Sequence, residues 1–135
     1  CKLARKQGSR PCLYMTWGRR DGDKENPDAY PDFLAMQKKI SREYLQAARG
    51  NDADVAPVGH AFALLHVADK SIFSSLYKKA GSHPAPLGGY LAACVFFGEI
   101  TGKSPSGISW NANINPAIAA TLRKTAVNVL GGDTF

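Results

Sequence analysis

The sequence of 135 residues predicts an α/β fold in which helices cover a parallel sheet. A strand-like apolar run at Pro11–Trp17 is followed by a helical repeat over Asp32–Arg49 and a second strand-like run at Ala53–Val58. Strand, helix and strand in this order are typical of a right-handed parallel crossover. The length suits one modest domain rather than two.

We expect Leu13–Trp17 and Asp54–Val58 to be the neighbouring parallel strands of this crossover. The first strand run is apolar along its whole length, which is typical of a strand buried on both faces. The polar segment Gly18–Pro31 follows it, and connections of that length are often functional. Asp32 is expected to cap the helix and Gly50 to end it. Apolar residues recur at helical spacing: Phe33, Met36, Ile40, Tyr44 and Ala47.

The remainder of the chain is predicted to be mostly helical. A short helix is expected at Gly59–Ala68, and mostly irregular structure at Asp69–Pro86, where prolines interrupt any regular helix. Leu87–Thr101 is apolar nearly all round, which predicts a buried helix. Asn115 is expected to cap the last helix, with Pro116 at its first position. The apolar stripe of that helix is Ile118, Leu122, Ala126 and Val129.

Composition is that of an ordinary globular protein, with 44% hydrophobic and 21% charged residues. The net charge is +6, but the cations are scattered in short pairs such as Arg19-Arg20, Lys38-Lys39 and Lys78-Lys79. Nucleic-acid binding favours cations gathered in a stripe with aromatic residues, so no nucleic-acid partner is expected. The apolar run Tyr90–Phe97 is too short to span a bilayer.

Cysteine and histidine spacing argues against a metal or cofactor site. The three cysteines form no C-x-x-C pair, so we expect no zinc. Cys12 and Cys94 lie in apolar runs and are expected to be buried thiols. His60 and His66 are six residues apart, not the four that place two ligands on one helix face.

His83 is the leading candidate for chemistry. It lies between Ser82 and Pro84 in a Gly/Pro-rich loop before an apolar helix, and in open parallel sheets such loops lie at the carboxyl ends of the strands. The alternative is a solvated loop histidine. Ser82 is a weak candidate nucleophile, because adjacent residues seldom aim at each other. Trp17 either walls a substrate pocket or belongs to the core, and both interpretations stay open.

Three segments resemble the carboxyl-terminal half of SGNH (GDSL-like) esterases: "LYMTWGRRDGD", "DVAPVGHAFALL" and "KKAGSHPAPLGGYLAACVFFGEITGKSP". The resemblance covers roughly Pro11 to Pro105, and the last segment is the most specific. It implies a flavodoxin-like three-layer α/β/α sandwich and a Ser–His–Asp triad that attacks an ester. Carried onto this chain, the histidine is His83 and the aspartate position is Ala80. His83 should then lie on the same side as Trp17 and the Gly18–Pro31 loop.

The chain departs from the family's pattern in two ways. It has no "GDS" motif and no Gly-x-Asn block, so the nucleophile and most of the oxyanion hole are absent from it. Ala80 cannot orient an imidazole, and losing the triad aspartate costs about four orders of magnitude in kcat. Asp69 is the nearest upstream carboxylate, and its segment would have to fold back for Asp69 to replace the missing aspartate.

The sequence therefore predicts an incomplete sandwich, with 1–135 as the carboxyl-terminal portion of one SGNH-hydrolase-like domain. The chain is interpreted as a degenerate, non-catalytic subunit of a larger assembly. The alternative is the histidine-bearing half of an active serine esterase whose GDS-bearing half lies in an upstream segment or another chain. A non-enzymatic binding module is the third hypothesis. Another polypeptide or a missing upstream segment is expected to cover strand 11–17, burying more than ~1,000 Å².

Overall fold

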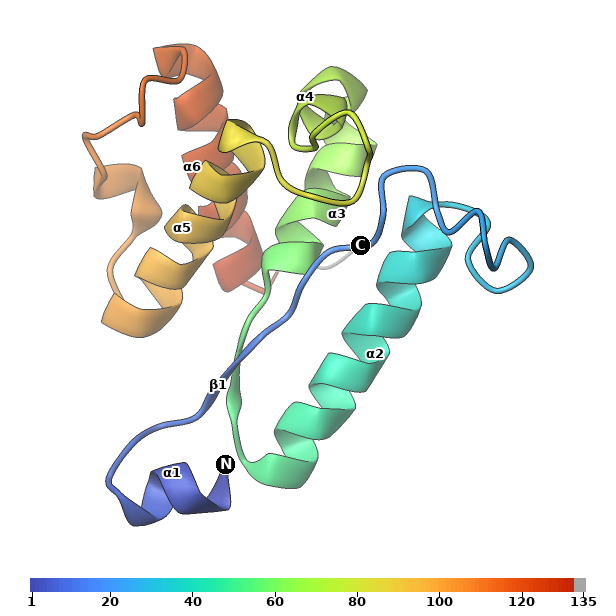
Figure 1. Ribbon diagram of the computed structural model, residues 1–135. Helices are drawn as coiled ribbons and strands as arrows, with labels where there is room; N and C mark the ends of the chain where they lie inside the picture. The colour runs from blue at the N-terminus through green and yellow to red at the C-terminus, as the bar shows by residue number, and fades with distance from the viewer. Residues whose placement is uncertain (133–135) are drawn as a thin grey trace.

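The computed structural model describes residues 1–132 and shows a mixed α/β chain that is mostly helical (Figure 1). Among these residues, no helix is long and apolar enough to cross a membrane. The elements in order are α1 (Lys2–Lys6), β1 (Cys12–Tyr14), α2 (Phe33–Asn51), β2 (Asp54–Ala56), α3 (Val58–Ala68), α4 (Lys70–Ser75), α5 (Pro86–Thr101), the 3-10 helix η1 (Pro105–Gly107) and α6 (Pro116–Leu130).

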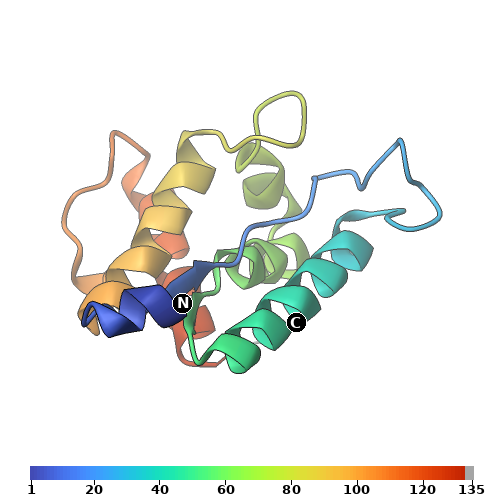
Figure 2. The same ribbon diagram turned by 60° about the horizontal axis from the view of Figure 1, so that its bottom comes forward.

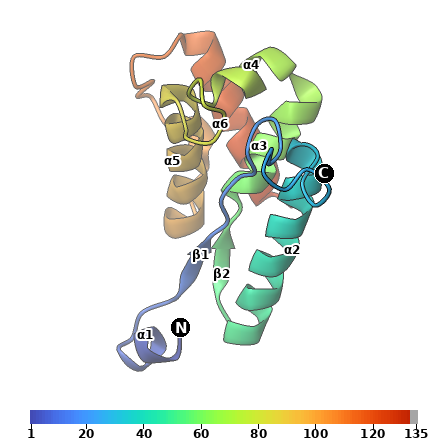
Figure 3. The same ribbon diagram turned by 45° about the vertical axis from the view of Figure 1, so that its right-hand side comes forward.

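The two strands form a small parallel sheet, which confirms the predicted pairing through the intervening helix. Leu13 lies opposite Val55, and Cys12 and Tyr14 lie opposite Asp54 and Ala56. Each strand has three residues, fewer than the sequence predicts. Helix α2 lies on one face of the sheet and α5 on the other (Figure 3). Helices therefore cover both faces of a sheet that has two strands in the described part of the chain.

The outer edge of β1 is open. The amide of Asp54 donates to the Pro11 carbonyl and the amide of Met15 to the Ala56 carbonyl, at 3.0 and 3.1 Å. In a parallel ladder this alternation turns the backbone groups of Cys12 and Tyr14 toward the other edge. No strand from residues 1–132 pairs with that edge. Cys12 is exposed and Tyr14 is 38% exposed, so the predictions of a buried Cys12 thiol and a doubly buried strand were wrong.

Helix α2 begins as predicted but ends later. The Asp32 carboxylate accepts a hydrogen bond from the Ala35 amide at 2.8 Å, which confirms the cap. At the other end the helix passes through Gly50 to Asn51, and Asp52 terminates it with a left-handed backbone of φ 48°. The expectation that Gly50 ends the helix was therefore wrong.

Helix α4 lies within the segment that was expected to be mostly irregular. Asp69 forms its cap, because its carboxylate accepts hydrogen bonds from the amides of Ser71 and Ile72, both at 2.9 Å. Phe73 on this helix is buried in the core. The two prolines exclude a helix only over the second part of the segment, and Pro86 is the first residue of α5.

Helices α3, α5 and α6 form the main core. Helix α6 has the predicted cap, because Asn115 accepts hydrogen bonds from the amides of Ala117 and Ile118. Figure 2 shows α5 and α6 side by side, an arrangement that their contacts support. The largest fully buried side chains of these three helices are Val58, Phe62, Leu65, Leu91, Cys94, Val95 and Leu122. Cys94 is thus buried as predicted.

A buried amide connects the end of β1 to α2. The Gln37 side chain is fully buried; its Oε1 accepts from the Gly18 amide at 2.8 Å, and its Nε2 donates to the Thr16 carbonyl at 3.2 Å. Gly59 of α3 lies against the same groups, and a Cβ at Gly59 would be 2.2 Å from both the Thr16 carbonyl oxygen and Gln37 Nε2. Only a glycine fits this close approach.

Candidate functional site

His83 lies on the closed loop that joins α4 to α5. Tyr77 and Pro84 form an antiparallel bridge at the base of this loop. The Lys78 amide donates to the His83 carbonyl at 2.9 Å, and the Gly81 amide donates to the Lys78 carbonyl at 2.8 Å. Gly81 has φ 73°, a left-handed backbone that favours glycine. The loop is thus internally fixed, and the His83 side chain on it is exposed.

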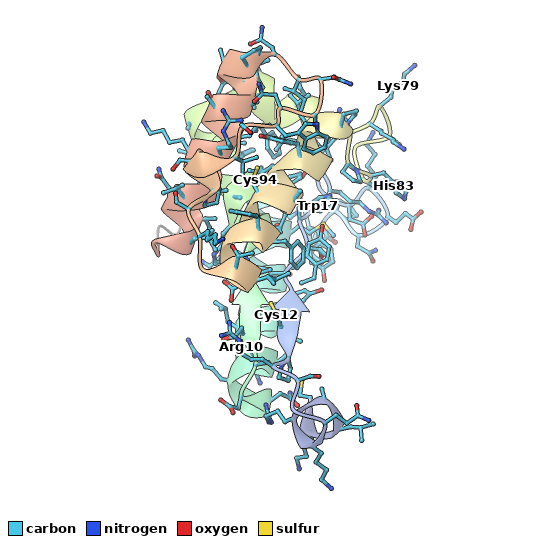
Figure 4. The ribbon with its side chains drawn as sticks, turned by 90° about the vertical axis from the view of Figure 1, so that its left-hand side faces the viewer. Arg10, Cys12, Trp17, Lys79, His83 and Cys94 are labelled. Carbon is cyan, nitrogen blue, oxygen red and sulfur yellow. The ribbon has the colours of Figure 1, made fainter. Side chains whose placement is uncertain are left out.

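Two hydrogen bonds attach this loop to the segment that follows β1. The Trp17 indole Nε1 donates to the Ser82 carbonyl at 3.1 Å, and the Arg20 amide donates to the Gly81 carbonyl at 2.8 Å. Figure 4 shows Trp17 and His83 at the same end of the molecule. His83 therefore lies beside Trp17 and the Gly18–Pro31 loop, where the sequence analysis places it.

The contacts of Trp17 are those of a positioning residue. Its indole stacks on the buried Phe62 ring, with centroids 4.6 Å apart and planes 6° apart, and its edge meets Tyr14 at 6.3 Å. Its only polar hydrogen is donated to Ser82. Trp17 thus connects the core to the histidine loop, and contact between Trp17 and a substrate stays a prediction.

Tyr77 gives the loop a second anchor, which sequence reasoning missed. Its hydroxyl donates to the Gly18 carbonyl at 2.8 Å, in a buried position at the start of the Gly18–Pro31 loop. Burial raises the pKa of Tyr77 well above its usual value, so the hydroxyl stays protonated and remains a donor throughout the physiological range. No sequence pattern marks this residue, because a tyrosine next to a helix end is equally consistent with plain core packing.

The groups around the His83 ring do not form a triad within residues 1–132. Nδ1 lies 3.1 Å from Ser82 Oγ. In a serine-hydrolase triad the acid faces Nδ1 and the nucleophile faces Nε2, so Ser82 occupies the side of the acid. Position 80, where the family's pattern has the acid, is alanine, and Asp69 is engaged as the cap of α4. The Ser82 hydroxyl thus contacts the imidazole and can orient it. This contact was not expected, because the side chains of adjacent residues seldom point at each other.

A charged cavity of about 340 Å³ lies next to this loop. Arg20 forms a bidentate ion pair with Asp21, in which Nη2 lies 2.8 Å from Oδ2. Arg19 forms an ion pair with Asp23, in which Nη1 lies 2.5 Å from Oδ1. The hydrogen bond from Arg20 is the main cause that lowers the pKa of Asp21. The cavity is lined by Arg19, Arg20, Asp21, Gly22, Lys24, Glu25, Lys79, Ala80 and Gly81.

The other histidines lie elsewhere. His60 is largely buried, and desolvation by burial lowers its pKa. His66 packs against Phe33 and lies within 2.7 Å of Lys70 Nζ, and burial lowers its pKa as well. Among residues 1–132 no group of three or more His, Cys, Asp or Glu side chains could hold a metal ion.

Fold and site together define a mixed α/β chain that presents an exposed histidine on a fixed loop at one end of a two-stranded parallel sheet. The chain is similar in structure to a DUF4886 family protein from Bacteroides uniformis ATCC 8492, with a TM-score of 0.79 and 18% sequence identity. The match covers 97% of this chain and 52% of that one, so this chain spans about half the length of the solved structure. No family model and no curated protein matches the sequence. At this identity the likeness concerns the fold, and function must be argued from the site.

Replacing Trp17 by Phe should loosen the histidine loop without unfolding the protein. The ring stack on Phe62 is kept, but the Ser82 carbonyl loses its donor, which costs about 1 kcal/mol. Amide hydrogen exchange of residues 78–83 should therefore speed up about fivefold, measured by NMR. Trp110→Phe is the matched control, because that indole is 69% exposed. Equal loop exchange in both variants would refute the positioning role.

Proposed function

We propose that the chain is the carboxyl-terminal portion of an SGNH-hydrolase-like domain and that it is a degenerate, non-catalytic subunit of a larger assembly. The observation that carries the proposal is the environment of His83. Its Nδ1 meets the Ser82 hydroxyl where a triad has a carboxylate, and position 80 is alanine. A hydroxyl carries no charge to stabilise an imidazolium. Such a histidine is a poor general base even when a serine is supplied.

The same proposal includes a cover for the open edge of β1. The outward backbone groups of Cys12 and Tyr14 are a template for one more strand. Tyr14 and the neighbouring Phe96, whose ring centroids are 4.7 Å apart, form an aromatic pair beside that edge. The matched solved chain is about twice as long, which supports a missing portion. The cover is an upstream segment or a second polypeptide.

A second candidate function is supported by the exposure of His83. A histidine retained only for packing would be buried, whereas this one is exposed on a loop held by two hydrogen bonds to its neighbour segment. In this alternative the chain is the histidine-bearing half of an active serine esterase. His83 takes a proton from a serine outside residues 1–135 and returns it to the leaving alcohol.

The purified chain should not hydrolyse p-nitrophenyl acetate faster than free imidazole at the same concentration. The reason is that residues 1–135 contain neither the family's nucleophile motif nor its oxyanion donors. Ala80→Asp alone should give no gain, because the members of a triad act as a unit. Covalent labelling of the pure chain by a serine-directed reagent, lost in His83→Ala, would contradict the proposal.

If the gene encodes residues upstream of Cys1, adding them to the chain separates the two candidates. The esterase hypothesis is correct if the longer protein hydrolyses the ester and His83→Ala lowers its kcat at least about 10³-fold. His66→Ala is the control and should leave kcat unchanged. If the longer protein is folded and has no activity above imidazole, the non-catalytic reading stands.

A further inference from the structure

The charged cavity beside the histidine loop has an uneven balance of charge. Arg19 and Arg20 are each neutralised by a neighbouring carboxylate, from Asp23 and Asp21. Lys24 and Lys79 also line the cavity, and neither forms an ion pair within residues 1–132. Glu25 is the one lining carboxylate without an arginine partner there. Four cationic side chains thus face three carboxylates, Asp21, Asp23 and Glu25, so the cavity has a surplus of one positive charge.

Two of the residues that line the cavity also have backbone amides without an acceptor within residues 1–132. The amides of Lys79 and Ala80 donate to no backbone or side-chain acceptor among the described residues. The wall that they form is fixed, because the Gly81 carbonyl accepts the Arg20 amide and the Gly81 amide bonds to Lys78. Alanine at position 80 keeps this wall free of negative charge. Ammonium groups and backbone amides are the donors that bind oxyanions.

We propose that this cavity binds an oxyanion group, a sulfate, phosphate or carboxylate carried by the ligand of the His83 site. One wall of the cavity, 79–81, belongs to the loop that carries His83, which follows Ala80 by three residues. Figure 4 shows Lys79 and His83 at the same end of the molecule. A volume of about 340 Å³ accommodates such a group together with the atoms that attach it. This inference names a ligand class for the His83 site of the second candidate function and rests on that candidate.

Titration with sodium sulfate, followed by ¹⁵N NMR at constant ionic strength in chloride, tests the site. Saturable shifts are expected in 19–25 and 79–81. Methyl sulfate should bind with similar affinity, because the group is proposed as a substituent of a larger molecule. Lys79→Ala should weaken sulfate binding about tenfold, the loss of one charge-assisted hydrogen bond.

Lys78→Ala is the matched control, since it removes the same charge from the adjacent exposed residue, which does not line the cavity. Equal weakening by both variants would show diffuse attraction and overturn the inference. So would shifts that never saturate, or binding of sulfate with exclusion of methyl sulfate. The readout is binding alone, so failure of the esterase assay leaves this result unaffected, and failure here leaves that assay unaffected.

Discussion

Gly59→Ala should strongly destabilise the protein. The new Cβ would lie 2.2 Å from the Thr16 carbonyl oxygen and from Gln37 Nε2, and the carbonyl belongs to the backbone that follows β1. Relief requires either that α3 moves away from the end of β1 or that the buried Gln37 amide moves away from its partners, the Gly18 amide and the Thr16 carbonyl. We expect a loss of about 3 kcal/mol or more in the free energy of unfolding, against a total of about 5–15 kcal/mol for a domain.

Urea unfolding followed by circular dichroism measures this loss, and Gly89→Ala is the matched control. Gly89 lies in α5, and a Cβ there would meet nothing within 4 Å. Alanine should stabilise that helix by roughly 0.5–1 kcal/mol. A Gly59→Ala protein with the wild-type midpoint would show that the close approach of α3 to the end of β1 is not as described.

Proline at two adjacent positions of β1 should have very unequal effects on stability. Leu13→Pro removes an amide that faces β2, together with a half-buried side chain, and should destabilise the chain by about 2 kcal/mol or more. Cys12→Pro removes an amide that faces the open edge, so the chain alone should change by less than about 1 kcal/mol. Thermal unfolding of the two variants measures the difference.

The same pair tests the cover proposed for the edge. In the longer protein, Cys12→Pro should become strongly destabilising, because the outward amide then pairs with an added strand. If Cys12→Pro remains neutral in the longer protein, the cover does not add to β1. If it unfolds the present chain as severely as Leu13→Pro, the edge is not open.

The crossover could be predicted from the sequence because its determinants are local. Asp32 and Asn115 cap their helices through their own side chains, and the apolar spacing of α6 identifies its buried face. The stripe predicted for α2 was wrong apart from Phe33, because the buried residues of that helix are Phe33, Gln37, Ser41 and Ala48, and Ala47 is exposed. Strand length could not be predicted in the same way. An apolar run does not show how many neighbouring strands it has. No strand among the described residues lies on the outer side of β1, and Cys12 and Tyr14 are exposed.

The position of the candidate site could be predicted from the sequence, but the hydrogen bonds that hold its loop could not. The loop order places His83 beside Trp17, whereas the bond from Trp17 to Ser82 and the bond from Tyr77 to Gly18 join residues 65 and 59 positions apart. Such bonds from side chains to distant carbonyls have no local pattern. Helix α4 has a local signal in its cap, Asp69, but the prolines that follow this short helix favour irregular structure.

The stacking of Trp17 on Phe62 also gives the protein an optical signal. The chain has two tryptophans, and the second, Trp110, is 69% exposed, so a soluble quencher such as acrylamide reaches it first. The emission that persists comes from an indole whose N–H is fastened to the loop of His83. Intrinsic fluorescence therefore distinguishes an attached histidine loop from a released one without any added label.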